Sequence, residues 1–394
     1  MKFASQLVNF NACPSDPFKP IATPIYQTAT FEQEHADQFG RYDYSRSGNP
    51  TRTVLEEQLA RLENAERAFA FASGVAAISS VTRLLSAGDE ILACDDLYGG
   101  TYRLFSKILN RTGVKVRYGD ACDLPRFAAA ITPETRLLYT ETPTNPLLRI
   151  CDIRALAGLA HDHGALLCVD NSAMSPYLQN PLDLGADIVV HSATKYLCGH
   201  SDVTAGVVAM RSPELAEQIY FLQNGEGSAL GPFDSYLLLR SIKTLKLRVD
   251  CQQSSARQIA EHLNTHPAVQ RVYYPGLPDH DGHDLHAQQA RGAGGLISFA
   301  TSSFELSKRI VEATRIFRVS VSFGSVNSSI SLPGCMSHAS IPAEVRRGRA
   351  FDADLVRLSI GIEDADDLID DLTQAFERAG VKEAAFATEA ADGG

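Results

Sequence analysis

A lysine lies just past an apolar run in the segment DIVVHSATK, which ends at Lys195. The run predicts a buried strand, and burial beside it disfavours the ammonium form, so the amine pKa should lie below about 10.4. Such an amine is a usable nucleophile for a carbonyl carbon. Nearby hydroxyls, on Ser192 and Thr194, are suited to a phosphate group. A surface lysine at a strand end is the alternative, and spacing alone favours it.

Two further segments add groups that bind an aromatic phosphate compound. Asp170 ends the apolar run ALLCVD, at the strand end where open α/β sheets bind ligands. Its carboxylate would pair with a protonated ring nitrogen, although a helix cap or a buried salt bridge is an equal alternative. In ASGVAAI, Gly74 and Val75 open a predicted helix whose free N–H groups favour phosphate.

Tyr98 and Asn145 are also placed next to predicted strands. Tyr98 in DDLYGGTYRLF lies at a strand-to-loop junction, where its ring would stack on a planar cofactor and its hydroxyl would exchange protons. Asn145 in ETPTNP would donate to a phenolic oxygen of the cofactor. A core tyrosine and a turn-forming Asn-Pro are the alternatives.

Two arginines are candidates for binding carboxylate or phosphate, which Arg recognises through two parallel hydrogen bonds. Arg46 lies beside Tyr44 in the irregular segment YSRSGNP, and Arg357 interrupts the apolar strand LVRLSIGI. A charged residue inside such a strand needs a partner. A substrate carboxylate would serve for Arg357, and a structural Asp or Glu is the alternative.

The elements between these residues predict an α/β protein in three parts. Residues 1–50 are irregular and are expected to lie on a neighbouring subunit. Residues 51–230 alternate short apolar strands with helices, which predicts a three-layer α/β/α domain around a mostly parallel sheet. Residues 231–394 begin with a long helical stretch at 231–266 and continue as a smaller α/β domain; the tail EAAFATEAADGG is expected to fray.

The composition favours a soluble cytoplasmic enzyme. The formal net charge is -11, and no basic stripe of the kind that binds nucleic acid is present. The start of the sequence has no secretory pattern, and no apolar run approaches the roughly 20 residues of a membrane span. The eight cysteines form no CxxC pair, which predicts reduced, buried thiols. His280, His283 and His286 have ligand-like spacing, but no Glu or Cys completes a metal shell.

The chain resembles the Cys/Met-metabolism family of fold-type I pyridoxal-phosphate (PLP) enzymes from about residue 20 to residue 379. The resemblance lies in segments that occur in the family's order: YSRSGNPTR, SGVAAI, DLYGGTYRLF, ETPTNP, DNSAMSPYLQNPLDLGADIVVHSATKYLCGHSD and VRLSIGIED. Other stretches are most similar to the plant-type cystathionine β-lyase branch: DNSAMSP, YFLQNGEGSALGPFD, VYYPGLPDHDGHDLH and VSFGSVNSSISLPGCMSHASIPAEVR.

The resemblance implies a role for each candidate residue. Lys195 holds PLP and then moves protons, and the other residues surround the cofactor and substrate. Asp170 binds the pyridine nitrogen, Tyr98 stacks on the ring, and Asn145 binds the phenolic oxygen. The phosphate is bound by Gly74, Val75, Ser192 and Thr194, and by Tyr44 and Arg46 of a neighbouring subunit. The substrate α-carboxylate is bound by Arg357 and Ser322, and Tyr44 is also expected to contact the substrate. An active dimer follows, and a tetramer is typical of the family.

The implied reaction is cleavage of L-cystathionine to homocysteine, pyruvate and ammonia. Two departures from the family pattern bear on this choice: Gly100 stands where methionine γ-lyases carry Cys, and Asn327 stands where γ-acting members often have Glu. A γ-synthase or γ-lyase on the same scaffold stays open, as does a non-catalytic binding protein, because fold alone does not fix a reaction.

Overall fold

The computed structural model describes the chain except residues 13–15, 302, 337–352 and 382–394. Its larger sheet has seven strands in the order β1-β7-β6-β5-β4-β2-β3. All neighbours pair in parallel except those of β7, so the predicted mostly parallel sheet is confirmed. The strands are β1 (Arg67–Phe71), β2 (Glu90–Cys94), β3 (Lys115–Gly119), β4 (Thr135–Glu141), β5 (Leu166–Asp170), β6 (Ile188–Ser192) and β7 (Gly206–Met210).

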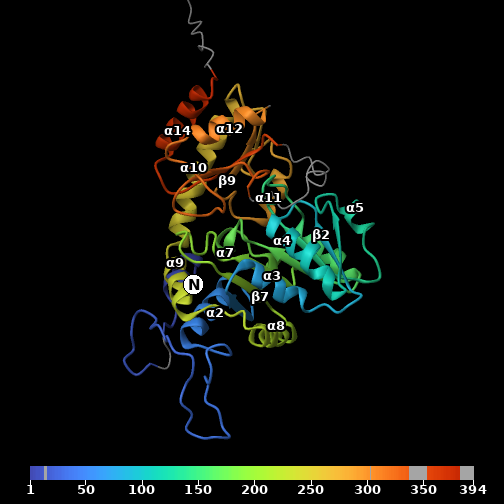
Figure 1. Cartoon of the computed structure of the whole chain (residues 1–394), viewed down its shortest axis with the longest axis vertical. Helices are drawn as coiled ribbons and strands as arrows, with labels where there is room; N and C mark the ends of the chain where they lie inside the picture. Colours follow the sequence, from blue (N-terminus) through green and yellow to red (C-terminus); the bar gives the residue numbers. More distant parts are fainter. Residues whose placement is uncertain (13–15, 302, 337–352, 382–394) are drawn as a thin grey trace, which may run out of the picture.

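Both faces of this sheet are covered, because successive residues of a strand point to opposite sides. In β1, Phe69 belongs to an apolar core with α3 (Gly74–Thr82) and α6 (Ile153–Asp162). The neighbouring Ala68 and Ala70 belong to a second core with α2 (Pro50–Leu62) and α9 (Pro232–Ile242). The result is a three-layer α/β/α arrangement (Figure 1). Helix α2 packs on the sheet through an apolar face, on which Val54, Leu55, Leu59 and Leu62 are buried.

Further helices and helical turns fill the connections. They are α1 (Phe3–Val8), α4 (Gly99–Arg103), α5 (Leu124–Ala128), α7 (Ser175–Leu178), α8 (Pro213–Glu226), the π-turn Leu104–Ile108 and the 3₁₀ turns Leu109–Thr112 and Pro181–Leu184. Helix α1 corrects the prediction that residues 1–50 are wholly irregular: buried Leu7 packs against the second core beside α2. Part of the following segment, before α2, extends away from the body at the bottom of Figure 1.

The long helix predicted over residues 231–266 is wrong in one respect, because the structure breaks it into α9 and α10 (Leu245–Thr265). The carbonyl of Ser241 accepts from the N–H of Thr244 at 3.1 Å and from Arg248 Nη2 at 3.1 Å. The bond from Thr244 to Ser241 spans three residues and forms a turn between the two helices. Both Ile242 and Leu245 are fully buried. Helix α10 then runs upward to the second sheet (Figure 1).

The second sheet has five strands in the order β10-β11-β12-β9-β8. These are β8 (Arg271–Tyr273), β9 (Leu296–Ala300), β10 (Arg318–Val319), β11 (Ser329–Ser331) and β12 (Val356–Ser359), with helices α11 (His283–Gln289), α12 (Phe304–Ala313) and α14 (Ala365–Arg378). Val356 and Leu358 join a third core with α10, α12 and α14. The strand alternation therefore turns Arg357 to the opposite face of the sheet. The division of the chain at residues 50 and 230 stays a prediction.

The cysteines and histidines are placed as follows. Among the seven described cysteines there is no disulfide, but Cys122, Cys251 and Cys335 are exposed, which corrects the prediction that the thiols are buried. Each of His280, His283 and His286 contacts a different backbone carbonyl, of Leu148, Pro275 and Gly292 respectively. No helix in the described ranges has the length and apolar character needed to cross a bilayer.

Candidate functional site

A cavity of about 530 Å³ opens at the carboxyl ends of β4, β5 and β6. Parallel strands end at one edge of a sheet, so residues far apart in sequence meet there. Ten of the twelve predicted site residues line this cavity, and only Tyr44 and Arg46 do not. The ten are Gly74, Val75, Tyr98, Asn145, Asp170, Ser192, Thr194, Lys195, Ser322 and Arg357.

Lys195 lies in a tight turn after β6. The turn is closed by the N–H of Lys195 bonding to the carbonyl of Ser192 at 3.1 Å and by Gly199 N–H bonding to the carbonyl of Lys195 at 2.7 Å. Arg248 of α10 holds the next residue by donating to the carbonyl of Tyr196 at 2.8 Å. Burial lowers the pKa of the Lys195 amine to about 8, helped by the positive charge of Arg357 and opposed by Asp170. The predicted shift of this amine is confirmed in direction.

Ser322 joins Lys195 to Arg357. Its hydroxyl accepts from Lys195 Nζ at 2.5 Å, and its carbonyl accepts from Arg357 Nη2 at 2.7 Å. The backbone of Ser322 has φ of +80°, a left-handed conformation that costs a non-glycine residue about 1–3 kcal/mol and is found at functional sites. Two residues from different sheets are thus held against one strained serine.

Arg357 is buried, and among the described residues no carboxylate accepts a hydrogen bond from it. Its Nη1 donates to Asn145 Oδ1 at 2.8 Å, its Nε is buried without a partner, and burial lowers its pKa to about 10. Only 2% of the residue is exposed. A buried guanidinium with donors left over is suited to an added anion, which supports the carboxylate over the structural ion pair.

Asp170 lines the cavity as the last residue of β5. Its Oδ2 accepts from the Tyr139 hydroxyl at 3.2 Å, and its Oδ1 accepts from the N–H of Ser172 at 2.9 Å. Burial, followed by the negative charge of Asp170, raises the pKa of Tyr139, so the phenol is a donor there. The carboxylate is held in place while its remaining lone pairs can accept a further donor.

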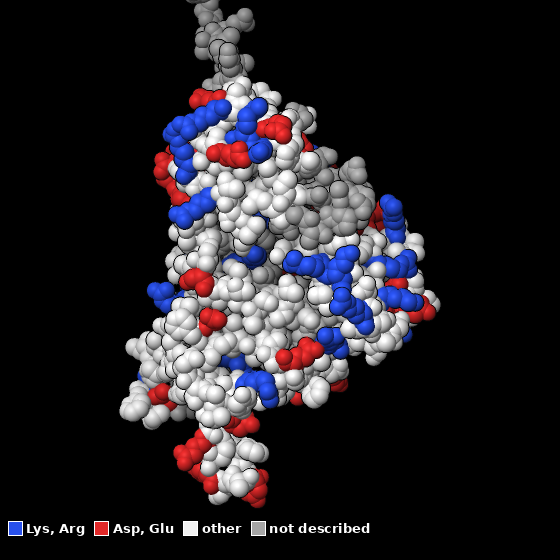
Figure 2. Space-filling view, viewed as in Figure 1, with Lys and Arg blue, Asp and Glu red and all other residues white. Residues whose placement is uncertain are grey.

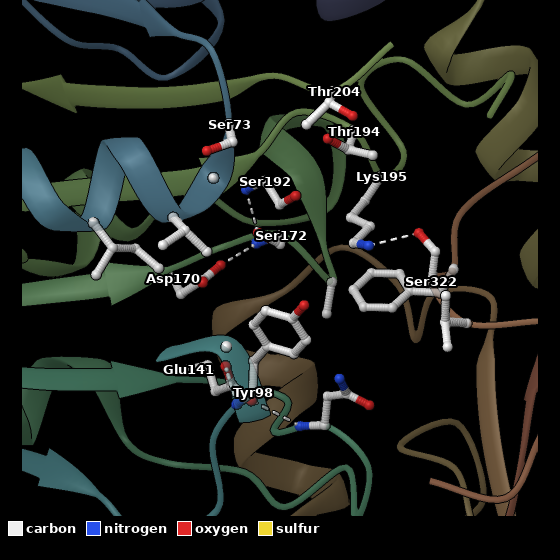
Figure 3. A pocket seen from close by; sticks show the side chains of 18 of the residues that line it. Ser73, Tyr98, Glu141, Asp170, Ser172, Ser192, Thr194, Lys195, Thr204 and Ser322 are labelled. Atoms are coloured by element: carbon white, nitrogen blue, oxygen red, sulfur yellow. Dashed lines mark hydrogen bonds between the residues drawn. The ribbon is translucent and has the colours of Figure 1, made fainter. Parts of the chain in front are cut away.

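Hydroxyl groups gather on one side of the cavity (Figure 3). Ser73 caps α3 by accepting from the N–H of Ala76 at 3.1 Å. A Cβ on Gly74 would lie 2.9 Å from Ser192 Cα, so only glycine lets this helix start so close to β6. The hydroxyl-bearing residues on this side are Ser73, Ser192, Thr194 and Thr204.

Tyr98 and Asn145 approach from the other side and are held by the same carboxyl group. Glu141 Oε2 accepts from the N–H of Tyr98 at 3.3 Å, and Glu141 Oε1 accepts from the N–H of Asn145 at 3.1 Å. Burial, with the charges of Asp170 and Asp96, raises the pKa of Glu141. A Cβ on Gly100 would lie 2.3 Å from the Tyr98 ring, so a side chain at residue 100 would displace that ring.

Several lining residues were missed from sequence, and their signals differ. Glu141 stands in ETPTNP and Ser73 is a helix cap directly before Gly74, so both could have been found locally. Phe323, whose ring lies 5.0 Å from Lys195 Nζ, directly follows Ser322, and Arg103 stands in the segment DLYGGTYRLF, so the predicted residues beside them were the available signal.

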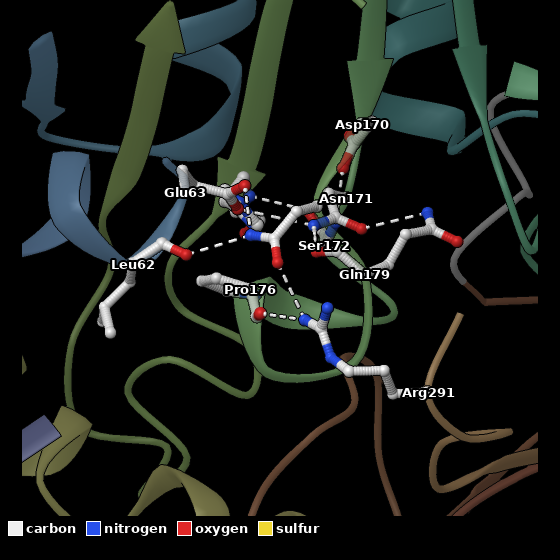
Figure 4. Close-up of polar contacts among 11 residues, drawn as sticks. Leu62, Glu63, Asp170, Asn171, Ser172, Pro176, Gln179 and Arg291 are labelled. Carbon is white, nitrogen blue, oxygen red and sulfur yellow. Dashed lines mark hydrogen bonds and ion pairs between the residues drawn. The ribbon is translucent and has the colours of Figure 1, made fainter. Parts of the chain in front are cut away.

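A buried polar network lies next to Asp170 (Figure 4). Glu63, at the end of α2, is fully buried, and its Oε1 lies 2.5 Å from His191 Nε2. Asn171 Nδ2 reaches Glu63 Oε1 at 3.4 Å and the carbonyl of Gln179 at 2.8 Å. His191 and Asn171 are the chain neighbours of Ser192 and Asp170, so the network fixes the ends of β5 and β6.

Replacing Glu63 by alanine is expected to lower the melting temperature by about 5 °C or more. Removing one member of a buried hydrogen-bonded pair leaves its partner buried without a hydrogen bond, which costs about 1–3 kcal/mol, and more where a charged group is involved. Thermal melting followed by circular dichroism measures the change. Glu66→Ala, at an exposed residue in the next turn of chain, is the matched control and should change the melting temperature by less than about 1 °C. Equal shifts in both variants would contradict the importance of the network.

Tyr44 and Arg46 lie outside the cavity of their own chain. The Arg46 guanidinium lies 5.2 Å from the Tyr44 ring centroid, and Arg46 Nε donates to Asn224 Oδ1 at 3.2 Å. Tyr44 is 41% exposed. Their predicted contact with the phosphate of a neighbouring subunit concerns a second chain and stays a prediction.

Comparisons with known proteins find a matching family model, similar sequences and similar structures. A family model described as Cys/Met metabolism PLP-dependent enzyme matches residues 4–377. A chloroplastic cystathionine β-lyase from Arabidopsis thaliana is 58% identical over 362 residues, which cover 92% of this chain and 78% of that protein. A cystathionine γ-lyase from Bacillus subtilis is 49% identical over 357 residues, which cover 91% of this chain and 94% of that protein. The crystal structure of cystathionine γ-lyase from Lactobacillus plantarum, complexed with L-serine, has a TM-score of 0.94 and 44% identity, covering 96% of this chain and 100% of that one.

Proposed function

This chain belongs to the Cys/Met metabolism family of PLP-dependent enzymes, and we propose that it is a cystathionine β-lyase of methionine biosynthesis. The net reaction converts L-cystathionine and water into homocysteine, pyruvate and ammonia. The resemblance found in the sequence, the fold type and the cofactor are confirmed by the comparisons. The 58% identity to the Arabidopsis thaliana β-lyase supports the choice of the Cβ–S bond.

The residues of the cavity fit PLP. Lys195 offers the amine for its aldehyde, and Asp170 offers a fixed carboxylate for its ring nitrogen. The start of α3 and the hydroxyls beside Gly74 offer donors for its phosphate. Tyr98 would cover the ring, and Asn145 would bind the phenolic oxygen. When bound, PLP supplies an electron sink for the electrons left at Cα after proton removal.

Different residues of the chain bind the substrate and transfer protons. Arg357 and Ser322 bind the substrate α-carboxylate, which places Cα over the amine of Lys195. That amine, when neutral, removes the Cα proton. After the Cβ–S bond breaks, the thiolate of homocysteine takes a proton from Lys195 or from the Tyr98 hydroxyl. The observation that carries the proposal is that Lys195 and Arg357 both bind Ser322 within one cavity, which brings a base and a carboxylate-binding group together at one residue.

The surroundings of the cavity suit a substrate with two carboxylates. Arg103 of α4 lines the cavity, and Figure 2 shows further Lys and Arg side chains beside the hollow in the middle of this face. Local positive charge attracts an anion even though the formal net charge of the chain is -11.

A γ-acting enzyme is the second candidate, favoured by the 49% identity to the Bacillus subtilis γ-lyase. Incubation with L-cystathionine separates the two, because β-cleavage yields pyruvate and homocysteine whereas γ-cleavage yields 2-oxobutyrate and cysteine. Chromatography of the oxoacids measures the ratio, and we expect pyruvate in excess. A purified protein that stays colourless after addition of PLP would instead support a non-catalytic binding protein.

Capture of PLP by the cofactor-free protein is expected to depend on pH through Lys195. The amine attacks an aldehyde only when it is neutral, and its pKa of about 8 sets the neutral fraction. The rate should therefore rise about tenfold per pH unit below pH 8 and level off above it. Stopped-flow absorbance between pH 6.5 and 10 measures this rate. A rate that still rises steeply at pH 10 would indicate an unshifted lysine.

The active unit is proposed to be a dimer, assembled further into a tetramer. The N-terminal segment supports this, because it exposes large apolar side chains that a neighbouring chain would cover: Phe18 at 90%, Ile21 at 96% and Phe39 at 72%. Light scattering of the purified protein tests the mass. A cytoplasmic location is proposed as well, supported by the absence of disulfides among the seven described cysteines.

A further inference from the structure

Two cysteines outside the cavity, Cys122 and Cys151, are in direct contact. Their sulfur atoms lie 3.3 Å apart. Cys122 is exposed in the turn after β3, whereas Cys151 is fully buried just before α6. In the described part of the chain, this is the cysteine pair whose thiols share a hydrogen bond. We propose that the pair is an oxidation site that reacts with hydroperoxides and closes to a disulfide, independently of the lyase activity.

The surroundings of the pair fit this reaction. Cys122 lines a second cavity, of about 830 Å³, together with Arg126 and Arg149, so a small polar oxidant can reach its sulfur. Cys151 has no such access. Its pKa is raised, first by the hydrogen bond with Cys122 and then by burial, so it stays a thiol until its neighbour is oxidised. The exposed sulfur therefore reacts first, and the buried one second.

The steps balance without any other reactant. The sulfur of Cys122 attacks one oxygen of hydrogen peroxide, the O–O bond breaks, and a sulfenic acid and one water form. The sulfur of Cys151 then attacks the Cys122 sulfur, an S–S bond forms, and the S–O bond breaks with release of a second water. Two thiols lose two electrons in total, peroxide gains them, and the thiol protons end in the two waters.

The geometry needs only a small movement. A disulfide has an S–S length of about 2.05 Å, so the sulfurs at 3.3 Å must approach by about 1.3 Å. Cys151 is fixed, since its N–H donates to Thr142 Oγ1 at 3.0 Å and its carbonyl accepts from Gln289 Nε2 at 3.0 Å. Cys122 is held by one backbone bond to Asp120 Oδ1 at 3.0 Å in an exposed turn. The exposed turn is thus the part that moves.

Graded hydrogen peroxide added to the PLP-loaded protein tests this site. We expect an intact mass lower by two hydrogens, a linked pair of peptides containing Cys122 and Cys151 after digestion without reductant, and full reversal by dithiothreitol. At the same dose, labelling of Cys122 by N-ethylmaleimide should fall at least tenfold. Linked peptides that join other cysteines, or oxidation of Cys122 without a link, would overturn the proposal.

Variants separate the two steps. In Cys151→Ser, the sulfenic acid of Cys122 should accumulate and be trapped by dimedone, whereas Cys122→Ser should give no link. Cys251→Ser, at an exposed cysteine of α10, is the matched control and should form the link as the unmodified protein does. Absorbance of bound PLP shows that each variant is folded. The linked peptides, the dimedone adduct and the maleimide labelling report only on the two cysteines. A negative result in the cystathionine assay would therefore not change what they show.

Discussion

Replacing Lys195 by alanine is expected to lower kcat/KM for L-cystathionine by at least about 10³-fold. The amine is proposed to hold the cofactor and to remove the Cα proton. A positioned acid–base group alone raises the reaction rate by about 10²–10⁴-fold. No other amine lines the cavity in the described chain, so no side chain there replaces it. Pyruvate release, followed with a coupled dehydrogenase, measures the loss.

The control for this prediction is Lys308→Ala, at an exposed residue of α12, which should keep activity within about twofold. Circular dichroism should show the same secondary structure for both variants. If the Lys195 variant kept more than a tenth of the activity, the proton would be removed by another group, and Tyr98 would be the next residue to replace.

The position of the site could be predicted because the chain alternates strands and helices. Parallel strands bring their carboxyl ends to one edge of the sheet, so a polar residue that follows an apolar run is expected to lie at that edge. Asp170, Ser192 and Lys195 were identified on that ground, and all three line the cavity. Arg357 was identified differently, because a charge inside an apolar strand must find a partner on the face opposite the core.

Contacts between distant segments could not be predicted in the same way. Glu141 binds the N–H groups of Tyr98 and Asn145, and this role depends on two loops meeting in space. The break between α9 and α10 has no Pro or Gly as a signal; across it, the Arg248 side chain donates to the carbonyl of Ser241, seven residues earlier. Asn327, used to weigh γ-chemistry, is exposed and does not line the cavity. The choice of bond therefore depends more on the comparisons than on that residue.

Replacing Arg357 by lysine is expected to lower kcat/KM about 10–100-fold, mainly through a higher KM. Lysine keeps the charge but loses the planar fork that makes two parallel bonds to a carboxylate. A hydrogen bond to a charged group is worth about 1.5–3 kcal/mol, which sets this range. Steady-state kinetics with L-cystathionine measure both constants. Arg318→Lys, at an exposed residue of β10 in the same sheet, is the matched control and should change neither.

Whether the substitution changes KM or kcat shows whether Arg357 binds the substrate carboxylate. The α-carboxylate keeps its charge while the Cα proton and the Cβ–S bond are lost, so its contact with Arg357 has about the same strength in the ground state and in the transition state. Uniform binding of that kind changes KM and leaves kcat nearly constant. Arg357→Ala adds a second readout, because the positive charge that helps to lower the pKa of Lys195 is removed. The pH at which PLP capture levels off should then rise above 8 in the alanine variant and stay near 8 in the lysine variant. A fall in kcat at constant KM, with no such change in pH, would place the carboxylate on another residue.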